Sequence, residues 1–168
     1  CVAWVSPVTS PGKDYVLAAL PLYHIFSLTV CCFGFLSQGS HCVLVTDPRD
    51  SKRFIALLKK VPITVFVGIN TLFNNLLHHQ ALSSIDFSHL KLTVAGGMAV
   101  QEVVSDKWQK VTGSIILQGY GLTETSPVVC INPVTEAVFN GSIGLPVSST
   151  DVVILDDEGR VVPASEPG

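Results

Sequence analysis

Apolar and polar residues follow one another along the chain in two different rhythms. Short runs of apolar and β-branched residues predict buried strands, and longer segments with apolar residues three or four positions apart predict helices. The predicted strands are YVLAALPL (15–22), HCVLV (41–45), ITVFVG (63–68), LKLTVAGG (90–97) and SIILQGYG (114–121).

A helix is predicted after each of the first four strands. The first covers residues 25–36, and the second follows Asp50 or Ser51, either of which can cap it. The third carries its apolar stripe at Leu72, Phe73, Leu76 and Leu77, and the fourth, at Val100, Val103, Val104, Trp108 and Val111, ends at Gly113.

Strict alternation of strand and helix predicts the fold class. It favours βαβ units with right-handed crossovers, and therefore an α/β fold of three αβα layers around a mostly parallel sheet. Beyond Pro127 the pattern changes to short strands, GSIGLPV and TDVVILDDEGRVV, the latter with a hairpin turn at residues 157–159. We predict a partial αβα subdomain over residues 1–139 and the start of a small antiparallel β subdomain over residues 140–168.

The composition narrows the range of partners. Hydrophobic residues make up 48% of the chain and charged residues 14%, and the net charge is −3 without a basic run, which argues against a nucleic-acid partner. The longest nearly apolar run, residues 25–36, is shorter than the roughly 20 residues of a membrane span. Because the chain starts at Cys1 and stops at SEPG, we expect a fragment of a longer protein.

The five cysteines are odd in number and show no C-x-x-C spacing. Most lie in apolar runs, which indicates buried, reduced thiols in a cytoplasmic protein. A redox role for the adjacent Cys31 and Cys32 is the alternative, although neighbouring side chains on a helix point in different directions.

Candidate functional residues follow the predicted strands directly. In an open α/β sheet, ligands bind beyond the carboxyl ends of the strands, where loop amides and helix N-termini converge. The strand ends supply Tyr23 and His24, Gly68 and Asn70, Gly96 and Gly97, and residues 119–124. We expect these distant segments to meet at one site.

The segment QGYGLTETSP, residues 118–127, carries the densest chemistry. Glu124 suits a carboxylate that holds Mg²⁺ against phosphate oxygens, although an exposed loop acid fits the spacing as well. Thr123 offers a hydroxyl to phosphate or caps a turn. Tyr120 stacks on a base or folds back on the core.

The glycine pairs and His24 also leave alternatives open. Gly96-Gly97 and Gly119-x-Gly121 let a flat ligand approach the backbone, but plain turns need glycine too. His24 is either a core histidine bonded to the backbone or a group beside a carboxylate or phosphate.

Several other kinds of site lack their sequence patterns. The histidines have no metal-ligand spacing, so no site made only of protein ligands is expected. No G-x-S-x-G nucleophile motif is present, and AGGMAV is not the G-x-G-x-x-G dinucleotide motif.

Four motifs in order carry a resemblance to a known family. These are PLYHIF (21–26), AGGM (95–98), GYGLTE (119–124) and GSIGLP (141–146). Together they resemble the AMP-forming adenylating enzymes, which include acyl-CoA synthetases, luciferases and amino-acid adenylation domains. ITVFVGINTLFNNLL and DFSHLKLTVAGGM look most like bacterial long-chain fatty acid–CoA ligases. The whole chain aligns with the middle of their large N-terminal domain.

The resemblance implies a two-step reaction. A fatty acid carboxylate attacks the α-phosphate of ATP to give acyl-AMP and pyrophosphate, and the thiol of coenzyme A then displaces AMP. Cofactors and partners would be ATP/AMP, Mg²⁺, coenzyme A, the fatty acid and the remainder of the chain. We expect a cytoplasmic protein, with the complete enzyme able to contact the inner face of the membrane peripherally.

The resemblance also implies roles for individual residues. Gly96, Gly97 and Met98 would border the adenine and the acyl channel, and Asn70 and Thr71 would open a helix along the acyl tunnel. Tyr120 would stack near adenine, between Gly119 and Gly121, which let substrate pass close to the backbone. Thr123 would contact phosphate, Glu124 would hold Mg²⁺, and His24 would lie near the acyl carboxylate.

Some family features have no counterpart in these residues. The Ser/Thr/Gly-rich phosphate loop would lie before Cys1, and the ribose-binding aspartate, the hinge and the catalytic lysine would lie after Gly168. Met98 stands where many relatives carry alanine or glycine. We therefore expect this chain alone to be inactive. The alternatives are a non-catalytic nucleotide-binding or interaction module, and a ligase for an aryl or short-chain acid.

Overall fold

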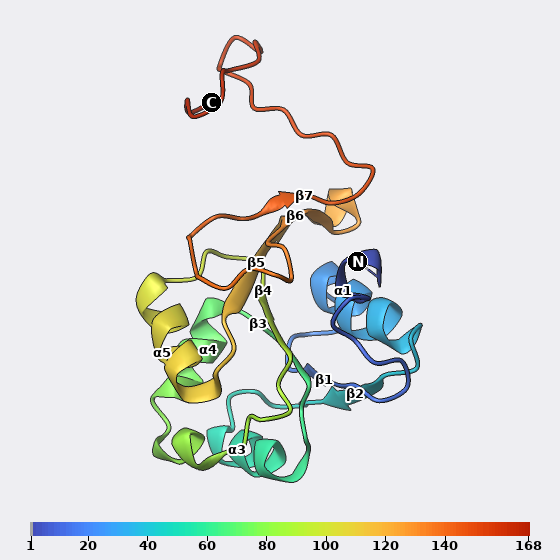
Figure 1. The fold of residues 1–168 in the computed structure, drawn as a ribbon, viewed down its shortest axis with the longest axis vertical. Helices are drawn as coiled ribbons and strands as arrows, with labels where there is room; N and C mark the ends of the chain where they lie inside the picture. Colours follow the sequence, from blue (N-terminus) through green and yellow to red (C-terminus); the bar gives the residue numbers. More distant parts are fainter. Residues whose placement is uncertain (1) are drawn as a thin grey trace.

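Seven strands form a single mixed sheet in a computed structural model that describes residues 2–168 (Figure 1). The order is β2-β1-β3-β4-β5-β6-β7; the strands from β2 to β5 pair in parallel, and β6 and β7 are antiparallel. The strands are β1 (Tyr15–Ala18), β2 (His41–Leu44), β3 (Val65–Gly68), β4 (Leu92–Ala95), β5 (Ile116–Gly121), β6 (Val128–Ile131) and β7 (Leu145–Pro146).

Helices cover both faces of the sheet (Figure 1). One face carries α3 (Ser51–Lys60), α4 (Asn70–Leu77) and α5 (Glu102–Thr112). The other carries α1 (Val2–Val5), the short α2 (Ile25–Ser27) and the π-helix η1 (Leu28–Gly34). Two 3₁₀-helices complete the set, η2 (Gln80–Ser84) and η3 (Thr123–Thr125). The predicted three-layer α/β fold with a mostly parallel sheet is confirmed.

Trp108 is the centre of the larger core. Its side chain is completely buried, and its ring lies edge-on to Phe66 and Phe73 at centroid distances of 5.1 and 4.8 Å. The indole nitrogen donates to the hydroxyl of Thr93 on β4 at 3.2 Å, so the one polar atom of the ring is satisfied. Strands β3 and β4 are thereby fixed to α4 and α5.

The helix ends follow the predicted capping residues. The Asp50 carboxylate accepts a hydrogen bond from the Arg53 backbone and is the N-cap of α3. Gly113 ends α5 in the left-handed conformation, with φ of 75°. These local signals were sufficient because each acts within a few residues of the chain.

Two helical features and two strands differ from the sequence prediction. The helix expected at 25–36 is mostly a π-helix, whose wider turn the apolar pattern does not distinguish from an α-helix. Helix α1, which precedes the first predicted strand, was not predicted. Strand β6 was not predicted either. Strand β1 is also shorter than its apolar run: it ends at Ala18, three residues before Pro21.

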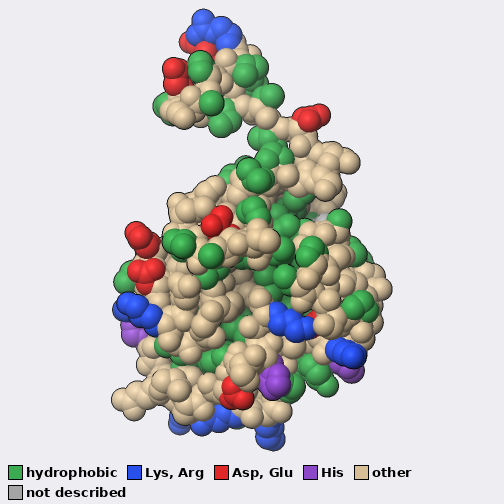
Figure 2. Space-filling model, viewed as in Figure 1, with side chains coloured by type: hydrophobic (Ala, Val, Ile, Leu, Met, Phe, Trp, Pro, Cys, Tyr) green, Lys and Arg blue, Asp and Glu red, His purple; other side chains and the backbone are tan. Residues whose placement is uncertain are grey.

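The C-terminal segment continues the antiparallel edge and then leaves the body (Figure 1). Strand β7 pairs with β6, and the predicted turn forms with a hydrogen bond from Gly159 N to Asp156 O of 3.0 Å. The strands predicted on either side of that turn do not form, since a single bridge, from Leu155 to Val161, joins the two sides. Figure 2 shows hydrophobic side chains on this segment and in a band below it. The boundary between residues 139 and 140 stays a prediction.

The cysteines within residues 2–168 carry free thiols. Cys31 and Cys130 are buried, whereas Cys32 and Cys42 are half-buried; Cys1 lies outside the described residues. Burial raises the pKa of the Cys31 thiol to about 12, which leaves it unreactive. Across the described residues, every helix is too short or too polar to cross a membrane.

An ion pair holds the amino ends of the strands together. The Asp14 carboxylate is fully buried and accepts hydrogen bonds from Lys91 Nζ at 2.8 Å and from the Ser10 backbone at 2.5 Å. Burial raises the pKa of this carboxyl, but the hydrogen bonds from Lys91, Ser10 and Thr64 outweigh it and hold the pKa below its usual value. Asp14 thus joins the segment before β1 to the start of β4.

Replacing Asp14 should destabilise the fold in a pH-dependent way. Since the folded pKa is lowered, the stabilisation is present above the unfolded value near 4 and is lost as pH falls through the folded pKa. Asp14→Asn should cost about 1–3 kcal/mol at neutral pH in urea unfolding, and the difference should shrink in acid. Asp106→Asn, an exposed change on α5, is the control. A difference that does not vary with pH would contradict the account.

Candidate functional site

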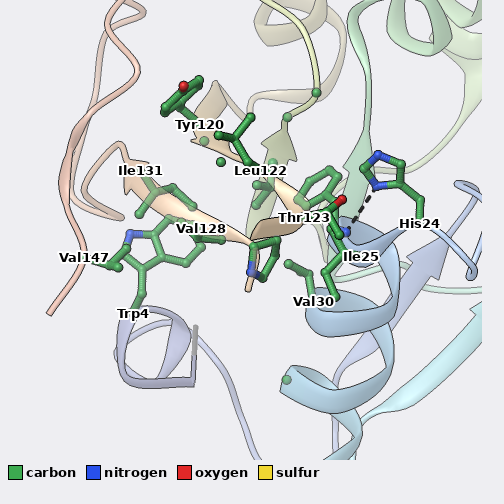
Figure 3. Close-up of a pocket in the computed structure, with 18 of the residues that line it drawn as sticks. Trp4, His24, Ile25, Val30, Tyr120, Leu122, Thr123, Val128, Ile131 and Val147 are labelled. Carbon is green, nitrogen blue, oxygen red and sulfur yellow. Dashed lines mark hydrogen bonds between the residues drawn. The ribbon is translucent and has the colours of Figure 1, made fainter. Parts of the chain in front are cut away.

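A cavity of about 290 Å³ lies at the carboxyl ends of the parallel strands (Figure 3). Segments from distant parts of the chain line it: α1, the α2–η1 helix, the end of β4, β5 with η3, and β6. This is the edge at which the sequence predicted a ligand site. The parallel register of β1, β3, β4 and β5 brings their ends together.

Most of the predicted site residues line this cavity. They are His24, Gly96, Gly97, Gly119, Tyr120, Gly121, Thr123 and Glu124. Met98 does not: its side chain is 48% exposed and lies outside the lining. Tyr23, Gly68 and Asn70 are also outside it, and Tyr23 points into solvent with 90% of its surface exposed.

His24 is exposed and is the N-cap of α2. Its Nδ1 accepts a hydrogen bond from the Phe26 backbone N–H at 3.2 Å, drawn as the dashed line in Figure 3. In the neutral ring the proton therefore lies on Nε2, which is available to donate. His24 is therefore not the core histidine that the sequence allowed as one alternative. Its Nε2–H is a hydrogen-bond donor at the cavity wall.

The GYGLTE segment forms a tight turn between β5 and β6. Gly119 pairs with Ile131 and Gly121 with Val128, and Leu122 N donates to Pro127 O at 2.9 Å. The Thr125 hydroxyl lies inside the turn, 2.8 Å from the carbonyl oxygen of Pro127 and 2.9 Å from the Leu122 backbone N–H. Because Thr125 supports the turn from within, the side chains of Thr123 and Glu124 stay exposed at the cavity.

Gln118, on β5, connects the glycine loop after β4 to the segment around Ser142. Its side chain is buried; Oε1 accepts from Val100 N at 2.8 Å, and Nε2 donates to Ser142 O at 3.2 Å. Its backbone N–H donates to Asn132 Oδ1 at 2.6 Å, and Asn132 Nδ2 donates to the same Ser142 oxygen at 3.0 Å. Four separate segments are thereby joined at one buried point.

Asn70 fixes the same loop from the opposite side. Its Oδ1 accepts from Gln101 N at 3.0 Å, next to the amide held by Gln118. The two successive amides that lead into α5 are therefore bound by side chains from the two sides of β4, Asn70 after β3 and Gln118 on β5. Asn70 thus holds the end of the loop that contains Gly96 and Gly97.

Glu124 is the acidic group at the cavity. Among residues 2–168 it forms no ion pair, and no cluster of three or more His, Cys, Asp or Glu side chains is suited to a metal. A cation here would take one protein carboxylate and complete its shell from substrate oxygens and water. That set is chemically suited to Mg²⁺ rather than to a metal held wholly by protein.

The apolar lining of the cavity was missed from the sequence. Trp4, Ile131 and Val147 lie on the side of the cavity opposite His24, and Val30 lies beside Ile25 on the helix that follows His24 (Figure 3). Trp4 is held there because its Nε1 donates to Asn132 O at 2.9 Å. The apolar runs that contain Val30, Ile131 and Val147 are visible in the sequence, but their meeting at one cavity depends on tertiary packing.

Comparisons with known sequences identify relatives along the whole chain. The profile of the family described as AMP-binding enzyme matches residues 1–168. The long-chain-fatty-acid–CoA ligase of Yersinia pestis is 49% identical over 163 residues, which are 97% of this chain and 29% of that protein. The Bacillus subtilis protein of the same name is 34% identical over 160 residues, or 94% and 28%. The chain thus spans less than a third of the curated relatives it matches.

Solved structures share the fold. An anthranilate CoA ligase in complex with anthranoyl-AMP superposes with a TM-score of 0.85 and 27% identity, covering 92% of this chain and 30% of that one. A benzoate CoA ligase from Burkholderia xenovorans gives a TM-score of 0.84 at 24% identity, over 98% of this chain and 35% of the other. At that identity the second match bears on the fold alone.

Gly121 should be the glycine that this turn cannot replace. A Cβ at Gly121 would lie 1.7 Å from Pro127 O, a backbone atom, whereas a Cβ at Gly119 would meet Ile131 side-chain atoms at an ordinary 3.5 Å. Gly121→Ala should therefore cost about 3 kcal/mol or more in urea unfolding, and Gly119→Ala about 1 kcal/mol or less. Equal effects of the two changes would show that the turn adapts freely.

Proposed function

The chain belongs to the AMP-binding enzyme family, and from this we propose that the whole protein is a long-chain fatty acid–CoA ligase. The observation that carries the proposal is the 49% identity to such a ligase over 97% of the chain. The cavity supports it, because glycines, hydroxyls and a carboxylate come from the strand ends and η3, while apolar side chains come from α1, η1 and β6. A fatty acid has the same division between carboxylate and alkyl chain.

The proposed reaction has two steps. An oxygen of the fatty acid carboxylate bonds to the α-phosphorus of ATP, the bond to the β-phosphate breaks, and pyrophosphate leaves. The coenzyme A sulfur, having lost its proton, then bonds to the acyl carbon and AMP leaves. Negative charge develops on phosphoryl oxygens, so positioning and hydrogen-bond donors supply most of the catalysis.

The backbone near the glycines would receive the nucleotide. Gly96 and Gly97 follow β4, and Gly119 and Gly121 lie on the adjacent β5, so two exposed backbone segments face one cavity. Tyr120, 44% exposed, would stack on the adenine, and Met98 would border it from outside the present lining. The proposal assigns these residues to binding rather than to bond breaking.

The groups that would act on the reacting atoms are His24, Thr123 and Glu124. His24 presents Nε2–H, which would donate to the fatty acid carboxylate and orient it. Thr123 would donate its hydroxyl to a phosphate oxygen. Glu124 would hold Mg²⁺, which when bound would neutralise charge on the phosphates.

The activity is proposed for the whole protein. The chain spans less than a third of the long-chain ligases it matches, and coenzyme A, ATP and the fatty acid would be bound together with the remaining residues. We expect the isolated chain to be inactive. Cytoplasmic location and peripheral contact with the inner membrane face also belong to the proposal.

An aryl acid is the second candidate substrate. It is favoured by the structural match to a ligase whose complex contains anthranoyl-AMP. That match has 27% identity, against 49% for the long-chain ligase, so the fatty acid is the better supported substrate. A non-catalytic nucleotide-binding module of the same fold is the remaining alternative.

The substrate prediction is tested by pyrophosphate exchange into ATP. The full-length protein should catalyse exchange with long saturated acids, more weakly with short ones, and at background level with benzoate or anthranilate. Residues 1–168 alone should give no exchange. Preference for an aromatic acid would favour the aryl alternative, no exchange by the full-length protein would favour the non-catalytic module, and exchange by the isolated chain would refute its predicted inactivity.

A further inference from the structure

Gly34 occupies a helical position where its backbone does not require glycine. It is the last residue of η1, helical structure continues through Leu36, and its φ lies outside the left-handed region. Glycine is among the poorest helix formers, so its presence here needs another reason. A common reason for glycine in a helix is close packing against a neighbouring element.

No neighbouring element fills the space in front of Gly34. Apart from its chain neighbours and the nearest backbone of its own helix, a Cβ built there would meet one atom within 4 Å, the Thr29 carbonyl oxygen, at a tight 3.1 Å. Gly34 also lines the cavity, together with Val5, Val30 and Phe35. The space that a side chain would occupy is therefore part of the cavity itself.

Gly34 lies at the apolar end of the cavity. The helix runs from His24, at the donor end, past Val30, which lies farther along it in Figure 3, and reaches Gly34 one turn later. Ten residues separate His24 from Gly34, which corresponds to at most about 15 Å of helix. A chain whose carboxylate lies at His24 would extend along this helix toward Gly34.

We propose that Gly34 sets the length of acyl chain that the cavity accepts, because its missing side chain leaves room for the terminal methylenes. The inference rests on the proposed ligase function and adds a specificity-determining residue to it. A π-helix suits this role, since its wider turn opens the wall of the cavity around Gly34. The cavity beside Gly34 is lined by the apolar side chains of Val5, Val30 and Phe35, so the effect on the substrate should depend on chain length.

The test compares Gly34→Ala and Gly34→Leu in the full-length protein with saturated acids of graded length. For each methylene that no longer fits, kcat/KM should fall about fourfold, while short acids react as with the wild type. Gly34→Leu should move the optimum further than Gly34→Ala. Phe33→Trp adds bulk on the same helix at a side chain that is 65% exposed, and should leave the length profile unchanged.

The outcomes separate this inference from the proposed function. If the wild-type protein activates no straight-chain acid, both fail. If it prefers long acids and neither variant shifts the optimum, only the role of Gly34 fails. An equal loss at all lengths, with an increased KM for ATP, would show that the substitution disturbs the whole site and would likewise overturn the inference. Because a Cβ at position 34 would lie 3.1 Å from the Thr29 carbonyl oxygen, urea unfolding of both variants is the control for misfolding.

Discussion

The buried side-chain amide of Gln118 fixes the relative positions of the two backbone loops of the site. Its Oε1 holds the amide of Val100 and its Nε2 holds the carbonyl of Ser142, while Asn132 pairs with its backbone and with Ser142. A buried amide that loses a partner keeps the full cost of desolvation, so the network favours one arrangement of all four segments. The loop after β4 and the segment around Ser142 are consequently held together on β5.

The rest of the site follows from this constraint and from the sheet. Parallel strands place their carboxyl ends at one edge, Gly121 lets β5 turn tightly into β6, and Asn132 on the segment after β6 anchors Trp4. Polar groups therefore gather at the strand ends, and apolar side chains of α1, η1 and β6 enclose the space beside them. A ligand with a charged head and an alkyl chain matches that division, which is the physical content of the proposed function.

Much of this arrangement could be predicted from the sequence, and the exceptions have physical causes. The five parallel strands and their helices are encoded in local apolar runs, and the positions of the glycines, Thr123 and Glu124 follow from strand order. His24 is an unusual N-cap residue, so its capping role gives little local signal. The lining by Trp4 and Val147, and the contact between Gln118 and Ser142, join residues far apart in sequence, and no local pattern specifies them.

Hydrogen exchange at the amide of Val100 tests the role of Gln118 most directly. Gln118→Met keeps a side chain of similar length but removes the acceptor, so the account predicts faster exchange at Val100 and weaker AMP binding by the full-length protein. Amides in the Trp108 core should keep their protection. Unchanged exchange at Val100 and unchanged AMP affinity would contradict the claim that Gln118 holds the two loops of the site together.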